Sequence, residues 1–256
     1  MTLQEALTSQ DGVWHVPEGW RQGRGAYGGL VVGALVHAIE ERIADPARVV
    51  RSVTAEIPGA VLPGPSEIRV EILRAGNSLT TARAALVQQG ETRAHAVAIC
   101  AAARPNMPRW LELEPPSAPP PDAVQPVPPG TPFPEFAQHF DYRIVEGIPG
   151  SGGAAVTLGW IRARNAGRVR DASLVAALID AWYPATLPRF EAFRPMATIA
   201  FTLEAIGDVA DLGDEALLYR GVVPVCGDGY FTETRELWRA DGRLVARNHQ
   251  TFAIIK

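Results

Sequence analysis

The stretch of residues 30–39 restricts the fold of this chain more than any other feature. Eight of these ten residues are apolar, and His37 is the one polar side chain among them. A helix is predicted over residues 28–44, and the Asp45-Pro46 pair ends it. Because a helix that is apolar on every side has to be buried on every side, other elements must surround it.

A second helix of the same kind is predicted over residues 171–183, with Asp171 as its N-cap and Pro184 after its end. Asp180 is the one charged residue between Leu174 and Tyr183. Burial would raise the pKa of this carboxyl unless hydrogen bonds stabilise its ionised form. A buried carboxylate is seldom kept without a partner or a task. The alternative is an aspartate that reaches solvent at the helix end.

Strands are predicted after each helix from alternating apolar and polar residues. The turns between them include Gln89-Gly90 and a two-residue hairpin turn at Asp241-Gly242, which indicates an antiparallel sheet. The clearest strand segments are residues 68–72, 79–88, 95–103, 154–164, 196–205, 216–225, 230–239 and 243–255. One buried helix followed by four strands therefore occurs twice, which indicates an internal duplication.

A proline-rich segment separates the two copies. Residues 105–134 contain 12 of the 22 prolines of the chain. Proline fixes φ and lacks an N–H, so this segment cannot be a central strand or a helix interior. We expect an extended connector between about 104 residues before it and about 122 after it.

Composition excludes several classes of partner. With 24 basic and 28 acidic residues the formal net charge is −4, so nucleic acid is not expected as a partner. Cys100 and Cys226 cannot build a disulfide framework. The longest apolar run is too short to span a bilayer, and residues 1–10 lack a basic region followed by an apolar one. We therefore expect a cytoplasmic protein without a membrane partner.

Other motifs in the sequence lack the context that their usual function requires. Gly23, Gly25 and Gly28 match the G-x-G-x-x-G dinucleotide motif, but no buried strand precedes them and two helices are too few for a doubly wound sheet. The five histidines show no metal-ligand spacing, so no metal and no cofactor are expected. A G-x-S-x-G nucleophile elbow is missing from the sequence as well.

Three segments resemble the acyl-CoA thioesterase II (TesB-like) group of the thioesterase-like superfamily. They are residues 27–35 (Tyr-Gly-Gly-Leu-Val-Val-Gly-Ala-Leu), residues 70–78 with Arg-x-Gly-x-Ser, and residues 241–246 (Asp-Gly-Arg-Leu-Val-Ala) followed by Gln250. The resemblance implies an α+β double hotdog fold, in which two central helices pack on a continuous antiparallel β-sheet. Its units would be an N-terminal hotdog over 1–104, the connector over 105–134 and a C-terminal hotdog over 135–256.

The resemblance also implies a catalytic trio of Asp180, Thr198 and Gln250, with Thr202 as the alternative threonine if the register shifts. The chain departs from the family pattern after Thr198, where an acidic residue and a histidine are usual, and this departure bears on substrate preference. The corresponding residues of the first half are expected to be His37, Ser52 and Ala98. One competent site per chain is therefore expected.

These residue types suit hydrolysis of a fatty or other acyl-CoA thioester by water. Asp180 would take the proton of the water or orient it, and Thr198 and Gln250 would fix the water. The negative charge that develops on the thioester oxygen needs donors, and the first N–H groups of a helix are free for that task. Gly28 and Gly29 at the start of the first helix are the candidate oxyanion donors.

Two other functions remain open at this point. A hotdog enoyl-CoA hydratase or dehydratase would need an aspartate–histidine pair, and a non-catalytic acyl-CoA-binding protein would not use the trio at all. A homo-oligomer is expected in each case, because two fused units still leave sheet edges and one sheet face to cover. A role in fatty acid metabolism follows from the resemblance.

Overall fold

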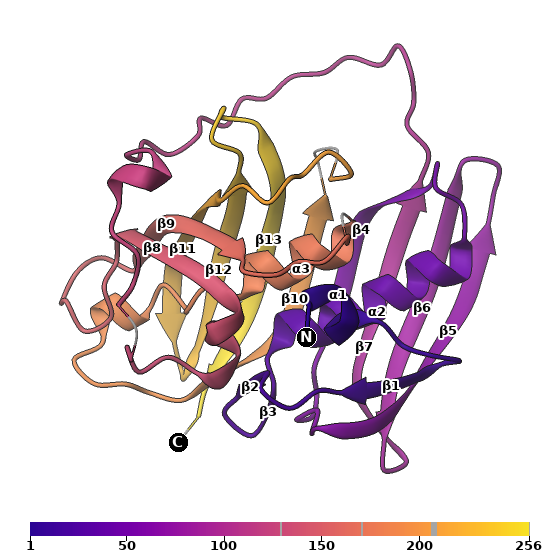
Figure 1. Cartoon of the computed structure of the whole chain (residues 1–256), viewed down its shortest axis with the longest axis horizontal. Helices are drawn as coiled ribbons and strands as arrows, with labels where there is room; N and C mark the ends of the chain where they lie inside the picture. Colours follow the sequence, from indigo (N-terminus) through magenta and orange to yellow (C-terminus); the bar gives the residue numbers. More distant parts are fainter. Residues whose placement is uncertain (129, 170, 206–208, 256) are drawn as a thin grey trace.

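One curved sheet surrounds two helices in this protein (Figure 1). The computed structural model describes residues 1–128, 130–169, 171–205 and 209–255. Its main sheet has 11 strands in the order β1-β5-β6-β7-β4-β10-β13-β12-β11-β9-β8, and a separate two-stranded sheet pairs β2 with β3. Neighbouring strands are antiparallel throughout the main sheet.

The helical elements are α1 (Leu3–Leu7), α2 (Gly28–Ile43), α3 (Ala172–Asp180) and the 3-10 turns η1 (Pro121–Ala123), η2 (Glu135–His139) and η3 (Leu187–Arg189). The strands of the first half are β1 (Val13–Val16), β2 (Arg21–Gln22), β3 (Gly25–Ala26), β4 (Val49–Glu56), β5 (Gly64–Ala75), β6 (Leu79–Gln88) and β7 (Glu91–Ala101). Those of the second half are β8 (Phe140–Glu146), β9 (Val156–Ala163), β10 (Met196–Ala205), β11 (Leu217–Gly227), β12 (Tyr230–Trp238) and β13 (Leu244–Ile254).

Helix α2 has the burial that its composition requires. Its first turns have no exposed face, and Leu30, Leu35 and Ile39 are completely buried. The helix ends at Ile43 because Ala44 adopts a left-handed conformation with φ of 51°, and its N–H bonds to the Glu40 carbonyl. The four strands β4 to β7 follow, which agrees with the predicted order of one helix and four strands, although no strand segment was predicted at β4.

Helix α3 begins as predicted and ends earlier than predicted. The Asp171 carboxylate accepts hydrogen bonds from the N–H groups of Ser173 and Leu174. The prediction of a helix to Tyr183 was wrong, because the regular helix ends at Asp180 and the N–H of Ala181 bonds to the Leu178 carbonyl instead. Trp182 leaves the helix and stacks on Tyr219, with ring centroids 4.9 Å apart. Asp180 is therefore the last helical residue.

The two halves share one sheet and one helical layer. Strand β4 of the first half pairs with β10 of the second half, with Thr54 opposite Thr202. Helices α2 and α3 lie side by side on the same side of the sheet and run in opposite directions (Figure 1). The predicted continuous antiparallel sheet with both helices on a common side is confirmed, and the α+β double hotdog fold with it.

The two matched hairpins differ at their turns. Gln89 and Gly90 both have positive φ and form a two-residue turn between the paired residues Gln88 and Glu91, as predicted. The two-residue turn predicted at Asp241-Gly242 was wrong. There the paired residues are Arg239 and Arg243, so the loop has three residues, and Gly242 takes the left-handed conformation (φ 85°) that such a loop requires.

A β-bulge interrupts the central strand of each half at the same place. The bulge in β10 lies between Thr198 and Ala200, after the pair Thr198–Phe252. The bulge in β4 lies between Val50 and Ser52, after the pair Val50–Cys100. The residue of the first half that corresponds to Thr198 is therefore Val50. The prediction that it would be Ser52 was wrong by two positions, because Ser52 lies after the bulge and corresponds to Ala200.

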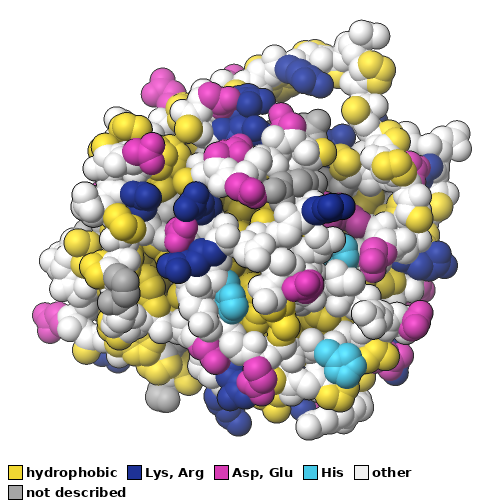
Figure 2. Space-filling view, in the orientation of Figure 1, with side chains coloured by type: hydrophobic (Ala, Val, Ile, Leu, Met, Phe, Trp, Pro, Cys, Tyr) yellow, Lys and Arg dark blue, Asp and Glu magenta, His cyan; other side chains and the backbone are white. Residues whose placement is uncertain are grey.

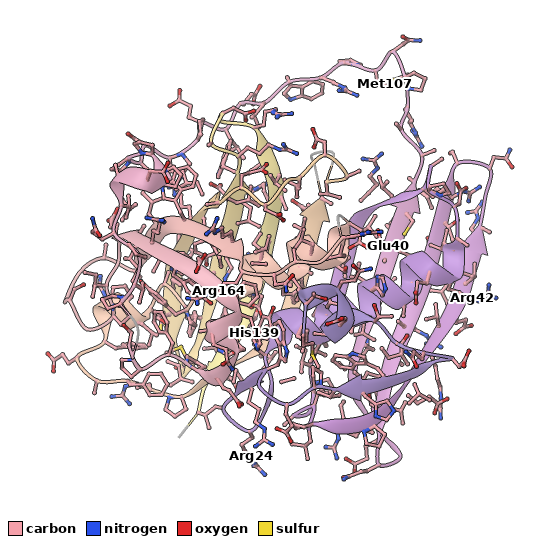
Figure 3. The ribbon with its side chains drawn as sticks, viewed as in Figure 1. Arg24, Glu40, Arg42, Met107, His139 and Arg164 are labelled. Carbon is pink, nitrogen blue, oxygen red and sulfur yellow. The ribbon has the colours of Figure 1, made fainter. Side chains whose placement is uncertain are left out.

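The connector runs from the end of β7 to the second half as an arch outside the sheet, with Met107 near its top (Figures 1 and 3). The short turn η1 is the one regular element among its described residues before η2, and Pro129 lies outside the described part. Acidic and basic side chains alternate over the face that Figure 2 shows. Within the described ranges, no helix is both long and apolar enough to cross a membrane.

Candidate active site

Asp180 lies where the end of α3 meets the beginning of α2, and the side chain is buried, with 6% of the residue exposed. The N–H of Gly29, in the first turn of α2, donates a hydrogen bond to its carboxylate. A Cβ atom on Gly28 would lie 2.9 Å from Oδ2 of Asp180, and one on Gly29 would lie 2.8 Å from its Cβ. The two glycines therefore allow the carboxylate to approach the helix backbone.

Gln250 connects Asp180 to Thr198. Its Nε2 donates to Oδ1 of Asp180 at 2.7 Å and to Oδ1 of Asn248 at 2.9 Å, and its Oε1 accepts from the Thr198 hydroxyl at 2.8 Å. An ionised carboxylate only accepts, so the nitrogen of the amide has to face Asp180 and the oxygen has to face Thr198. Gln250 is completely buried. The structure thus brings the three predicted residues together in one chain of hydrogen bonds.

The bulge in β10 decides which threonine reaches Gln250. Downstream of it, the buried residues of the strand are Phe201 and Leu203. The bulge reverses this alternation, so that Thr198 faces the interior as well. Thr202 donates its hydroxyl to the carbonyl of His249 at 3.3 Å and is not part of the Gln250 contacts. His249 itself is exposed, as expected for the neighbour of an inward-facing residue.

Strand β12 adds two charged residues that the sequence argument did not identify. Nη1 of Arg235 donates to Oδ1 of Asp180 at 3.0 Å, and Nε donates to Oε1 of Glu233 at 3.0 Å. Both side chains are buried, and they lie between Phe231 and Leu237 on the inward side of the strand. Two charged residues at inward positions of an alternating strand were the signal that could have found them.

Burial is the main influence on the acid–base behaviour of this cluster. It raises the pKa of the Asp180 carboxyl, and the Arg235 guanidinium and the hydrogen bonds from Gln250 and Gly29 oppose this effect. Burial likewise raises the pKa of Glu233 and of the Tyr219 hydroxyl. The carboxyl of Asp180 is therefore a weaker acid than a solvated aspartate, which suits a group that has to accept a proton.

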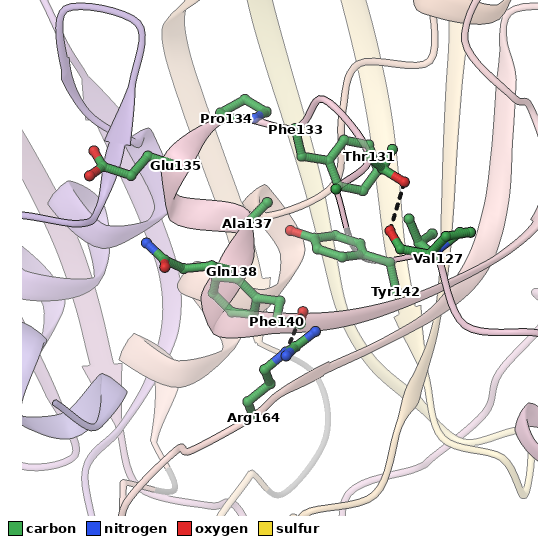
Figure 4. A pocket seen from close by; sticks show the side chains of 12 residues that line it. Val127, Thr131, Phe133, Pro134, Glu135, Ala137, Gln138, Phe140, Tyr142 and Arg164 are labelled. Atoms are coloured by element: carbon green, nitrogen blue, oxygen red, sulfur yellow. Dashed lines mark hydrogen bonds between the residues drawn. The ribbon is translucent and has the colours of Figure 1, made fainter.

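A surface pocket of about 410 Å³ lies beside the site, between the end of the connector and β8 (Figure 4). Phe133, Tyr142 and Arg164 are among its lining residues. The Tyr142 hydroxyl donates to the carbonyl of Ala181, the residue after Asp180, at 2.9 Å. One aromatic side chain therefore separates this pocket from the end of α3.

The first half has no corresponding trio. Its residues at these positions are His37, Val50 and Ala98. Nδ1 of His37 lies 3.6 Å from a carboxylate oxygen of Asp171. Among the described residues, no three His, Cys, Asp or Glu side chains are arranged to hold a metal ion.

Comparisons with known proteins extend over both halves. The model of the acyl-CoA thioesterase N-terminal domain matches residues 16–102, and that of the acyl-CoA thioesterase C-terminal domain matches residues 112–254. A search of the curated proteins found no match.

Solved structures show the same fold. A hot dog protein of unknown function from Alicyclobacillus acidocaldarius has a TM-score of 0.89 at 23% identity, with 99% of this chain and 98% of that chain covered. Acyl-CoA thioesterase II TesB2 from Mycobacterium marinum has a TM-score of 0.77 at 22% identity over 99% and 98%. The dehydratase domain of PpsC from Mycobacterium tuberculosis is more distant, with 0.52 at 13% identity over 90% and 85%.

The N-terminal domain model covers the first half of the duplicated chain, and the C-terminal domain model covers the second half. The C-terminal model alone matches more than half of the chain and includes Asp180, Thr198 and Gln250. The chain therefore belongs to the acyl-CoA thioesterase family and is a thioester hydrolase.

Proposed function

We propose that this chain hydrolyses fatty or other acyl-CoA thioesters by direct attack of a water molecule that Asp180, Thr198 and Gln250 position. The observation that carries the proposal is the Gln250 amide, which bonds Asp180 with one end and Thr198 with the other, while Asp180 and Gln250 are both buried. This amide fixes the distance and orientation between a proton acceptor and a hydroxyl. Such fixed geometry is what positioning a small nucleophile requires.

The hydrogen bonds determine what each group offers the water. The Thr198 hydroxyl donates its proton to Gln250, so its lone pairs remain available as acceptors. One proton of the water would bond to Thr198 and the other to the Asp180 carboxylate, and an oxygen lone pair would face the thioester carbon. As the C–O bond forms, Asp180 takes the proton. The C–S bond then breaks, and the proton passes to the departing CoA thiolate.

The start of α2 would stabilise the oxyanion of the tetrahedral intermediate. Gly28 and Gly29 are the candidates, since the first N–H groups of a helix have no partner within the helix. The N–H of Gly29 already donates to Asp180. That contact favours Gly28 as the donor to the thioester oxygen.

The two alternative functions have less support. The hydrogen-bond partners of the Asp180 side chain among the described residues are Gln250, Arg235 and Gly29, and a hydratase or dehydratase would need a histidine in this place. A protein that only binds acyl-CoA would have no use for a buried carboxylate, although burying one costs free energy.

Release of free thiol from acyl-CoAs of several chain lengths tests the proposal, with enoyl-CoA hydration measured in parallel. Asp180→Asn is expected to lower turnover by about 100-fold or more, as for loss of a general base. Asp241→Asn, at an exposed hairpin, is the matched control and is expected to retain the rate. Gln250→Ala should cost less than Asp180→Asn. An Asp180→Asn protein that hydrolyses acyl-CoA at the unmutated rate would contradict the mechanism.

We also propose the larger organisation of the protein: hotdog units over 1–104 and 135–256, joined by the connector over 105–134, in a cytoplasmic homo-oligomer that acts in fatty acid metabolism. The outer face of the sheet supports an oligomer, because Leu73, Ile99 and Ile199 are 37–48% exposed there. Light scattering at micromolar concentration tests the assembly. A monomer would refute it.

A further inference from the structure

Two buried charged residues of β12 lie behind Asp180 without a place in the water-attack mechanism. Glu233 is 0% exposed and Arg235 is 1% exposed. They are two residues apart, so both face the interior. A buried ion pair is weak evidence for stability, because its desolvation cost can exceed the attraction between the charges. Its presence beside the candidate base therefore calls for another explanation.

Contacts on several sides fix the Arg235 guanidinium in place. Nη1 donates to Oδ1 of Asp180 at 3.0 Å and to the carbonyl of Ile179 at 3.2 Å, and Nε donates to Glu233 at 3.0 Å. Its central carbon lies 5.3 Å from the ring centroid of Phe252. A side chain held in this way cannot move away from Asp180 without losing buried hydrogen bonds.

The charges of this cluster do not balance. One guanidinium faces two carboxyl groups, Asp180 and Glu233, and it can neutralise one carboxylate. Glu233 has further donors of its own, the Tyr219 hydroxyl at 3.0 Å and the N–H of Ala185 at 3.2 Å. The two carboxyls therefore compete for the same cation, and Glu233 determines how much of the positive charge of Arg235 acts on Asp180.

We propose that Arg235 is a positioning residue for thioester hydrolysis: it holds the Asp180 carboxylate against Gln250 and favours its ionised form, while Glu233 reduces this effect by sharing the guanidinium. This inference rests on the function proposed above. Arg235 acts through Asp180, because its described polar contacts are to Asp180, Glu233 and the Ile179 carbonyl.

Among the residues that the structure describes, the other titratable groups around Asp180 are tyrosines, and they stay neutral. Their hydroxyls come from three different elements: Tyr219 from β11, Tyr142 from β8 and Tyr27 directly before α2. Burial raises the pKa of each one well above 10. The ionisation of Asp180 should therefore respond to the charges of Arg235 and Glu233.

The acid limb of the pH dependence of kcat/KM tests the proposal, because it reports the ionisation of the essential base in the free enzyme. Glu233→Gln removes the competing charge and leaves Arg235, so the midpoint should move to lower pH. Arg235→Gln alone would leave two buried carboxyls unpaired and could prevent folding. The double variant Glu233→Gln/Arg235→Gln avoids this problem, and its midpoint should lie above that of Glu233→Gln by about one pH unit or more.

The order of the three midpoints separates this role from a structural one. We expect Glu233→Gln lowest, the unmutated protein next and the double variant highest. Glu204→Gln, at an exposed position of β10, is the control and should leave the midpoint in place. A lower rate with an unchanged midpoint in all variants would show that the pair only supports the fold and would overturn the proposal, as would shifts of both variants in the same direction.

Infrared spectroscopy keeps this test independent of the reaction. The carboxyl band that the unmutated protein has and Asp180→Asn lacks belongs to Asp180, and it can be titrated in each background. If no variant hydrolyses acyl-CoA, the proposed function fails while the band still decides the role of Arg235. Equal midpoints of this band in Glu233→Gln and the double variant would overturn the inference.

Discussion

Nε2 of Gln250 donates to Oδ1 of Asp180 at 2.7 Å, which joins strand β13 to the end of helix α3. The two residues are 70 positions apart in the chain. Both are buried, so neither group can replace this bond with one to bulk water. The geometry of each therefore depends on the other, and on Thr198 at the far end of the same amide.

The Thr198 hydroxyl is the first group to test. Thr198→Val keeps the shape of the side chain and removes the donor to Oε1 of Gln250, so the amide is free to rotate away from Asp180. We expect turnover of acyl-CoA to fall by about 10-fold to 100-fold, the size of effect that misplacement of a reacting group produces. Thr202→Val on the same strand removes a hydroxyl that bonds a backbone carbonyl and should leave the rate nearly unchanged. Equal losses in the two variants would argue against Thr198.

The close approach of Asp180 to α2 predicts a second result. Gly28→Ala would place a methyl group 2.9 Å from Oδ2 of Asp180, closer than a Cβ atom normally lies to an oxygen. Since φ of Gly28 is not positive, the backbone itself accepts alanine. We expect the carboxylate to move and turnover to fall by about 10-fold or more.

The matched control for this variant is Gly227→Ala at the end of β11, where nothing lies within 4 Å of the added methyl group. Thermal unfolding distinguishes a local effect from a general one. If Gly28→Ala hydrolyses acyl-CoA as fast as the control does, then the contact between Asp180 and the start of α2 does not matter for the reaction.

The sequence predicted the parts of this fold that depend on local patterns. The apolar residues of α2 and α3, the alternation in β6 and β13 and the repeated order of elements required no knowledge of distant contacts. Local patterns in the sequence did not indicate strands β1, β4 and β8. These strands follow from pairing with distant strands, such as β4 with β10, which a local pattern does not record.

The candidate site was predictable to a similar degree. The resemblance indicated Asp180, Thr198 and Gln250, and the structure links them by hydrogen bonds, while their catalytic roles remain predictions. Arg235 was missed because an arginine in an alternating strand is usually exposed. The bulge at Thr198 was missed as well, because it inserts one residue without any mark in the sequence.

The two cysteines should differ in reactivity. Cys226 is exposed and Cys100 is buried, and burial raises the pKa of the Cys100 thiol to about 12. Because the thiolate is the reactive form, Cys100 should not react near neutral pH. We expect one label per native chain with a maleimide or a disulfide reagent and two labels after unfolding, counted by mass spectrometry. Rapid labelling of Cys100 in the native protein would show that the sheet opens there.

The last prediction concerns Glu40 of α2 and its effect on the stability of the folded protein. Its carboxyl lies near the facing ends of α2 and α3 (Figure 3), accepts a hydrogen bond from the N–H of Ala172, and has one oxygen without a hydrogen-bond partner among the described residues. Burial, together with the charge of Asp171, raises its pKa from 4.5 to about 9. The folded protein therefore binds this proton more tightly than the unfolded chain does.

The sign of the pH dependence follows from linkage. Between pH 4.5 and about pH 9 the folded state holds the Glu40 proton and the unfolded state has lost it, so rising pH favours unfolding by up to about 1.4 kcal/mol per pH unit from this group. Glu40→Gln removes the ionisation and can keep the bond to Ala172. We expect the variant to be more stable than the unmutated protein at pH 8, by about 1–3 kcal/mol, and equally stable near pH 4.5.

Denaturant unfolding at a series of pH values measures this difference, with Glu112→Gln at an exposed position of the connector as the control. The two proteins should diverge steadily as the pH rises from 5 to 9, whereas the control should run parallel to the unmutated chain. A Glu40→Gln protein whose stability follows the unmutated curve at every pH would mean that Glu40 is already ionised in the folded state, with a charge partner that compensates its burial.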